Sequence, residues 1–244
     1  MGWTHPNTTL GRVLVDINTQ FDFLDPAGAV VVGNCETVVP RIRRLTALIR
    51  AMSLPVISSV ESHRPTDLFG GMPPHCIEGT IGQKKLGFTL LSPRIVVQAD
   101  NSFDLPYAVM SRYRQVVFAK QSSDLFANPK ADRLLTELDP QEYVLFGVAL
   151  ERWVKAVALG LLARHKRVAV VADACGYWSE ADAELALRQL SAKGIRIFTV
   201  DELTQVAAVP RRRLDRRTRA STRHHPAIRR APRAAAVRSG PADS

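Results

Sequence analysis

Charged and imidazole side chains stand directly after several apolar runs of this sequence. These residues are Asp16, Glu61, His63, Lys120 and the segment from Gly147 to Trp153. A carboxylate and a lysine that converge at one sheet edge can shift each other's pKa and act as a base and an electrostatic stabiliser. Polar residues also commonly end strands, so loop charges in water are the competing interpretation.

The apolar runs are continuous in Val, Ile and Leu and do not alternate with polar residues. They span residues 12–16, 55–60, 115–118, 143–148, 167–172 and 195–200, and amphipathic or apolar helical stretches span 38–52, 151–165 and 181–192. Continuous apolar strands are buried on both faces, which is typical of a parallel sheet covered by helices. We therefore predict a doubly wound α/β fold with a mostly parallel sheet. Ligands of such sheets bind beyond the carboxyl ends of the strands, where the strand order reverses.

Two regions do not follow this alternation of predicted strands and helices. Residues 61–112 hold several Pro and Gly residues and little helical period, which indicates a long insertion or a lid-like loop. Residues 210–244 are rich in Arg, Ala and Pro without hydrophobic periodicity, which predicts a disordered tail. The expected organisation is one domain over residues 1–209 followed by this tail.

The net charge of +10 belongs to the tail. Residues 211–244 hold eleven arginines and two aspartates, whereas the other 210 residues hold 22 basic and 21 acidic groups. Charge therefore does not make the domain a nucleic-acid binder. The tail could bind nucleic acid or an anionic surface with strong salt dependence, but it lacks the interleaved aromatic residues that stack on bases. The alternative, which we favour, is a solvated extension without a partner.

Several classes of protein are not expected from this sequence. The longest apolar stretch covers residues 156–163, far short of the roughly 20 residues that a membrane span needs. The first residues show no secretory signal. Cys35, Cys76 and Cys175 are widely spaced, without a zinc-type pair or a disulfide framework. A reducing cytoplasm is the expected location.

Five segments, taken in order, resemble the isochorismatase-like cysteine hydrolases, and most of all their nicotinamidase branch. They are LVDINTQFDFLDPAGAVVVG (14–33), PPHCIEGTIGQ (73–83), FAKQSSDLF (118–126), FGVALERWVKAVALGLL (146–162) and VVADACG (170–176). The resemblance covers about residues 10–205 and implies the same α/β fold. It also implies a small-molecule substrate, no nucleotide cofactor and, as often in this family, a homo-oligomer.

The resemblance implies catalytic positions for this chain. The general base of the family matches Asp16, its lysine matches Lys120, and its nucleophilic cysteine falls on Trp153. Backbone N–H groups of the preceding turn, at Val148 and Ala149, would hold the oxyanion. Trp153 carries no nucleophile, so hydrolysis through a thioester is not expected.

The first-strand motif also departs from the family. The family pattern Asp-x-Gln-x-Asp-Phe is matched here by residues 16–21, in which Asn18 keeps an amide group and Phe21 supplies an aromatic wall of the substrate pocket. Phe21, Phe23 and Trp153 could equally be plain core residues.

The resemblance further implies a metal site made by Glu61, His63 and His75. Glu61 and His63 are two residues apart, so they project from the same side of an extended segment, and His75 would complete the set for Zn, Mn or Fe. Glu61 stands where the family has Asp. Without the resemblance, two unrelated loop histidines would be the simpler interpretation.

Three functions remain open from these residues. The first is a hydrolase descended from enzymes that cleave a small amide such as nicotinamide, here without thiolate chemistry. The second is a cysteine-independent hydrolase that uses Asp16 as general acid or base, or a metal-activated water. The third is a pseudoenzyme in which a metal and the indole of Trp153 hold a heteroaromatic ligand.

Deleting residues 211–244 is expected to leave the domain folded, because this tail carries no periodic apolar residues to pack against it. Thermal unfolding of the truncated protein, followed by circular dichroism, should remain cooperative. Loss of the cooperative transition would contradict the proposed domain boundary.

Overall fold

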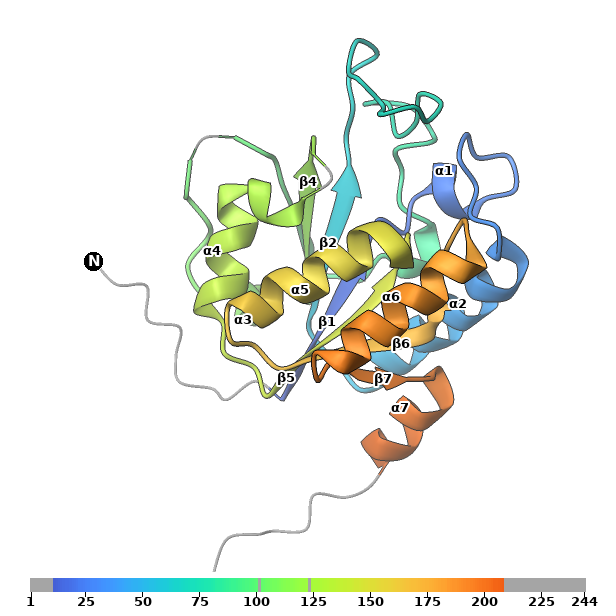
Figure 1. Cartoon of the computed structure of the whole chain (residues 1–244). Helices are drawn as coiled ribbons and strands as arrows, with labels where there is room; N and C mark the ends of the chain where they lie inside the picture. Colours follow the sequence, from blue (N-terminus) through green and yellow to red (C-terminus); the bar gives the residue numbers. More distant parts are fainter. Residues whose placement is uncertain (1–10, 101, 123, 209–244) are drawn as a thin grey trace, which may run out of the picture. The chain divides into compact units, whose positions relative to one another are not determined.

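A single parallel sheet of seven strands forms the centre of the protein. The computed structural model describes residues 11–100, 102–122 and 124–208, and the strand order within them is β3-β4-β2-β1-β5-β6-β7 (Figure 1). The strands are β1 (Arg12–Ile17), β2 (Val56–Glu61), β3 (Arg94–Val97), β4 (Gln115–Lys120), β5 (Glu142–Gly147), β6 (Val168–Cys175) and β7 (Arg196–Phe198). The predicted α/β class and parallel sheet are therefore confirmed.

The central strands form because their side chains are buried on both faces of the sheet. Every residue of β2, β4 and β5 is buried. Such a strand needs apolar residues at successive positions, which explains why these runs do not alternate with polar residues. The polar residues inside these strands, such as Asp16, Ser58 and Lys120, are consequently buried too, and each needs a partner.

Helices cover both faces of the sheet. They are α1 (Phe21–Leu24), α2 (Cys35–Ala51), α3 (Val109–Arg112), α4 (Pro129–Glu137), α5 (Lys155–Ala163), α6 (Glu180–Ala192) and α7 (Val200–Ala208), with short turns η1 (Gly87–Thr89), η2 (Leu125–Ala127) and η3 (Leu150–Val154). Figure 1 shows α5 and α6 in front of the sheet and α2 behind it, and α2 packs on β6 and α7. The order reverses between β1 and β5, where a ligand site is expected.

Several predicted elements differ in detail from the structure. The helix predicted over 151–165 begins with η3, a turn of π-helix, and only then becomes α5. The region 61–112 is not a plain loop, since it contains η1, β3 and α3. We did not predict α4, although Asn128 caps its N-terminus by accepting hydrogen bonds from the backbone N–H groups of Lys130 and Ala131. The predicted tail lies outside the described residues.

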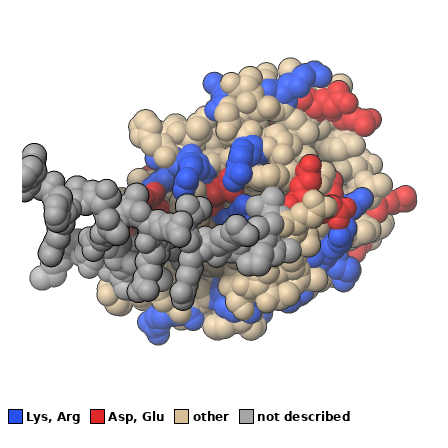
Figure 2. All heavy atoms as spheres, turned by 90° about the horizontal axis from the view of Figure 1, so that it is seen from below, with Lys and Arg blue, Asp and Glu red and all other residues tan. Residues whose placement is uncertain are grey.

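The charges of the domain are mixed in sign. Seen from below, basic and acidic side chains both lie among other residues on the surface (Figure 2), as the nearly neutral composition of the domain predicts. Within the part of the chain that the structure describes, no helix is long and apolar enough to cross a membrane.

Gly147 joins β5 to the candidate site and cannot carry a side chain there. Its φ is +117°, and a Cβ atom would lie only 2.1 Å from the carbonyl oxygen of Ile17 in β1. Both the backbone conformation and this close approach require glycine.

Gly147→Ala is therefore expected to lower the free energy of unfolding by at least about 2 kcal/mol, because positive-φ strain and a backbone clash add. Urea denaturation measures this loss. Gly194→Ala is the matched control, since Gly194 has φ +81° but no atom within 4 Å of the added Cβ. Equal losses in both variants would contradict the role of the close approach.

Candidate metal centre

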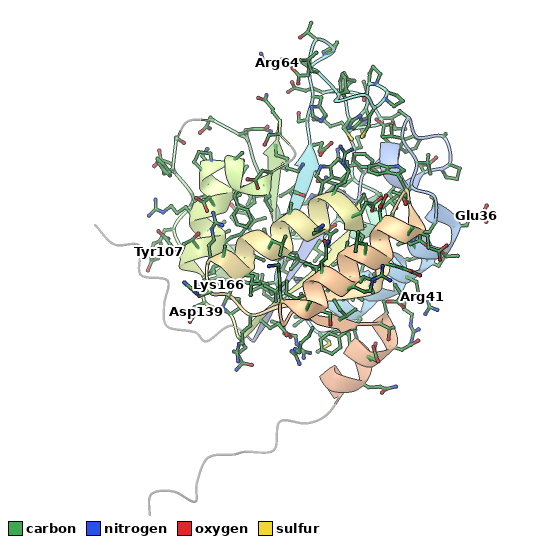
Figure 3. The ribbon with its side chains drawn as sticks, in the orientation of Figure 1. Glu36, Arg41, Arg64, Tyr107, Asp139 and Lys166 are labelled. Carbon is green, nitrogen blue, oxygen red and sulfur yellow. The ribbon has the colours of Figure 1, made fainter. Side chains whose placement is uncertain are left out.

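The candidate site lies beyond the carboxyl ends of β1, β2 and β4. Glu61 and Lys120 end β2 and β4 and are partners in the strand register. His63 follows β2, and its backbone N–H donates to the carbonyl of Cys76, which brings the loop around His75 back to the same place. Figure 3 shows this loop above the strand ends, with Arg64 labelled on it.

Glu61, His63 and His75 point at one another. The Nε2 atoms of both histidines lie 3.2 Å from Oε2 of Glu61, and the three ligand atoms lie within 4.8 Å of one another. Glu61 is 2% exposed and both histidines are buried. One carboxylate and two imidazoles form a set that binds Zn²⁺ or Fe²⁺ and leaves further coordination positions open.

The second ring nitrogens of the histidines support this arrangement. Nδ1 of His75 lies 2.8 Å from the carbonyl of Pro73 and therefore carries a proton, which leaves Nε2, the nitrogen that faces Glu61, as the one that would bind a cation after losing its proton. Nδ1 of His63 is buried without a hydrogen bond and lies 3.6 Å from a carboxylate oxygen of Asp67. The residues therefore fit a divalent cation by donor type, convergence and ring orientation.

Glu61 remains ionised in spite of its burial. Burial by itself would raise its pKa, but the charge of Lys120 and the hydrogen bonds from His63, His75 and Lys120 outweigh this effect and hold the pKa well below its usual range. The same interactions act on His75. Burial lowers its pKa, whereas the hydrogen bonds to Glu61 and Pro73 and the charges of Glu61 and Asp22 raise it, and the net direction is upward.

The other oxygen of Glu61 is held by side chains from β4 and from the residue that follows β1. Nζ of Lys120 donates to Oε1 over 2.7 Å, and Nδ2 of Asn18 donates to the same oxygen over 3.3 Å. Ser59 fixes the Asn18 amide by donating to its Oδ1 over 2.7 Å. Gln20 binds the backbone of Glu61 on both sides, accepting from its N–H and donating to its carbonyl. Glu61 is therefore fixed in position by both its carboxylate and its backbone.

Aromatic rings cover this cluster from the side of η3. The ring of Trp153 lies 5.4 Å from Nζ of Lys120 and 5.0 Å from the ring of Phe23. Phe23 in turn lies 5.5 Å from the ring of His75. Trp153 is 4% exposed and also contacts Trp178. The structure thus brings Lys120 and Trp153 together.

The structure does not bring Asp16 into this cluster. Asp16 is in register with Ser58, whereas Glu61 lies three residues later on β2, and side chains alternate between the faces of a sheet. Its Oδ2 accepts from Nζ of Lys85 over 2.8 Å and from Ser58 over 3.2 Å, on the face opposite to Lys120. Asp16 therefore forms a buried ion pair away from the donor set.

Asn18 stands where we expected the Asp16 carboxylate. From the sequence we expected Asn18 only to keep the amide group of the family pattern. A clearer signal was present, because Gln20, Asp22 and Phe23 match the last positions of the pattern Asp-x-Gln-x-Asp-Phe when it is placed two residues later. Asp22 supports this register in the structure, since its carboxylate accepts from the backbone N–H of Cys76 beside His75.

The predicted substrate-binding residues have mixed positions. Phe21 is only partly buried, and the ring contacts to Trp153 and His75 are made by Phe23. The backbone N–H of Val148 already donates to the carbonyl of Ile17 over 2.8 Å, so it is not free for an oxyanion. Ala149 is buried in the turn that leads into η3.

The comparisons with solved structures agree with the fold. An isochorismatase-like hydrolase from Alkaliphilus metalliredigens is 22% identical and matches 81% of this chain and 99% of its own, with a TM-score of 0.65. The pyrazinamidase of Pyrococcus horikoshii in complex with zinc is 21% identical over 77% and 98%, with a TM-score of 0.61. A protein from L. infantum in complex with nicotinate is 18% identical over 80% and 96%, with a TM-score of 0.60.

At these identities the structures show a shared fold alone. No curated protein matches the chain. The family model of the Isochorismatase domain, however, matches residues 12–202, which include every residue of the candidate site. The chain therefore belongs to the isochorismatase family.

Proposed function

We propose that this chain is a metal-binding member of its family that holds a small planar heteroaromatic ligand and does not hydrolyse it. The position of Trp153 carries this proposal. Its indole lies on the first turn after β5, beside Lys120 and Phe23, where the sequence resemblance places the nucleophilic cysteine. An aromatic ring can stack on a planar ligand but cannot attack a carbonyl.

The cysteines of the chain do not replace the missing nucleophile. Burial raises the pKa of the Cys76 and Cys175 thiols well above their usual range, and only a thiolate is an effective nucleophile. Cys35 is also buried, and its thiol donates to the carbonyl of Leu24. Thiolate chemistry is therefore not supported at any of the three positions.

The general base of the family, like its nucleophilic cysteine, is replaced in this chain. With the first-strand pattern placed two residues later, the base position of the family is Asn18, whose amide cannot take up a proton near neutral pH. Asp16 is not a substitute, because its carboxylate is paired with Lys85 on the other face of the sheet. We therefore do not adopt the hypothesis that Asp16 acts as general acid or base.

The metal-binding residues, in contrast, are complete. Glu61, His63 and His75 would hold a divalent cation, which as a Lewis acid would bind a ring nitrogen or a carboxylate of the ligand. Lys120 and Asn18 fix the Glu61 carboxylate, and Trp153 and Phe23 provide a flat apolar flank. The zinc complex and the nicotinate complex of the two similar proteins support this choice of ligands.

Replacing His75 is expected to weaken Zn²⁺ or Mn²⁺ binding at least tenfold, since the site loses one of three protein ligands. Isothermal titration of the native protein and of His75→Ala measures the change. His165→Asn is the control, because His165 lies at the end of α5 with a positive φ that asparagine also tolerates. Equal affinities of the native protein and His75→Ala would contradict the metal centre.

Restoring both lost groups is expected to restore chemistry. We expect no ammonia from nicotinamide with the native protein, Asn18→Asp or Trp153→Cys, and release of ammonia with Asn18→Asp/Trp153→Cys, because the thiol needs a base to become a nucleophile. The assay contains added Zn²⁺ or Mn²⁺, and circular dichroism confirms that each variant is folded.

Two results would count against this assignment. Ammonia released by the native protein and lost in His75→Ala would show hydrolysis by a cysteine-independent route and overturn the proposed function. A folded, metal-binding double variant that stays inactive would show that Asn18 and Trp153 are not the positions of the lost groups.

A further inference from the structure

We infer that the ligand of this site is an anion, a small planar carboxylate, and that the site selects it over the corresponding neutral carboxamide. The inference rests on the proposed function, and the charges and unused hydrogen-bond donors around Glu61 carry it.

The ammonium of Lys120 is paired with one carboxylate, that of Glu61, which also faces the metal-binding histidines. Its Nζ donates to Oε1 of Glu61 over 2.7 Å and to the carbonyl of Ser122 over 3.0 Å. In residues 11–100, 102–122 and 124–208, Glu61 is the only carboxylate paired with it. Glu61 also faces His63 and His75 and would face the cation. One negative charge thus serves an ammonium and a divalent cation together.

Two further carboxylates lie near the histidines but do not balance Lys120. Asp22 accepts from the backbone N–H groups of Ala29 and Cys76, one on each oxygen. Asp67 lies 3.6 Å from His63, accepts from the backbone N–H of Arg64 and is on a partly exposed loop, where water screens its charge. The excess positive charge therefore lies at Lys120, beside the ring of Trp153.

The hydrogen-bond donors at this point favour the same ligand. An ammonium has three donors and Lys120 uses two of them, while the amide of Asn18 has two and uses one, towards Glu61. Both oxygens of a carboxylate would accept from such donors, whereas a carboxamide offers only one accepting oxygen. A neutral ligand would also leave Lys120 with only the shared charge of Glu61.

The aromatic rings beside Lys120 and His75 indicate the shape of the rest of the ligand. Trp153 and Phe23 flank Lys120 and His75 with ring faces and edges rather than polar groups. A flat ring that carries the carboxylate is therefore the expected class, and a simple inorganic anion lacks the surface to use these contacts.

The test is a calorimetric comparison of nicotinate and nicotinamide binding to the full chain loaded with Zn²⁺. The native protein is expected to bind nicotinate at least tenfold more tightly. In Asn18→Asp the new carboxylate can pair with Lys120 and repels the ligand, so the ratio is expected to fall to about one or reverse. Leu68→Glu adds the same charge at a fully exposed position, 97% exposed, and is expected to keep the native ratio.

Each outcome has a distinct meaning. Binding of neither compound overturns the proposed function itself. Equal binding of both by the native protein, or tighter binding of nicotinamide, overturns the charge selection and leaves the proposed function standing. An unchanged ratio in Asn18→Asp also overturns the selection. Should Asn18→Asp not fold, Lys120→Gln provides the second variant, and it is likewise expected to lose the preference for nicotinate.

Discussion

The buried carboxylate of Glu61 is the group on which the candidate site depends. An ionised carboxylate removed from water is costly unless each oxygen is paired. Two imidazoles face Oε2, and Lys120 and Asn18 donate to Oε1. These partners come from β4, from the residue that follows β1 and from two points of the loop after β2. Pairing the carboxylate of Glu61 therefore fixes the ends of three strands and that loop relative to one another.

The buried charges on the two faces of the sheet form separate sets of ion pairs. On the face of Glu61 the charges converge on the candidate metal centre. On the other face Asp16 and Lys85 pair, Ser58 donates to the same Asp16 oxygen, and Lys85 also donates to Thr19. Lys85 belongs to a strand-like bridge with Gln20, whose side chain holds the backbone of Glu61. The second pair therefore stabilises the segment that supports the first.

The sequence was sufficient to predict the sheet, for an identifiable reason. Continuous apolar runs require burial on both faces, and this alone predicts a parallel sheet whose carboxyl ends carry Glu61 and Lys120. The sequence was insufficient to place Asp16 and Asn18. The alternation of side chains along a strand decides which face of the sheet each one joins, and we predicted that the first strand ends at residue 16, whereas β1 ends at Ile17. Asn18 has a φ of +49°, and its side chain bonds to Ser59 and Glu61 on the site face. No local pattern of residues predicts such a turn.

The polar and aromatic residues of the candidate site fall into two groups. His63, His75, Lys120 and Gln20 all serve to hold Glu61, and each has a hydrogen bond or an ion pair that does so. Asn18 and Trp153 differ, because an amide neither takes up nor supplies a proton and an indole forms no covalent intermediate. Both nevertheless keep contact with the cluster, Asn18 through Glu61 and Trp153 through Lys120. A site that had lost all function would have no physical reason to keep a buried ammonium against a shared carboxylate, since an apolar pair of similar volume would be at least as stable there. The retained charge of Lys120 is what the proposed anionic ligand would balance.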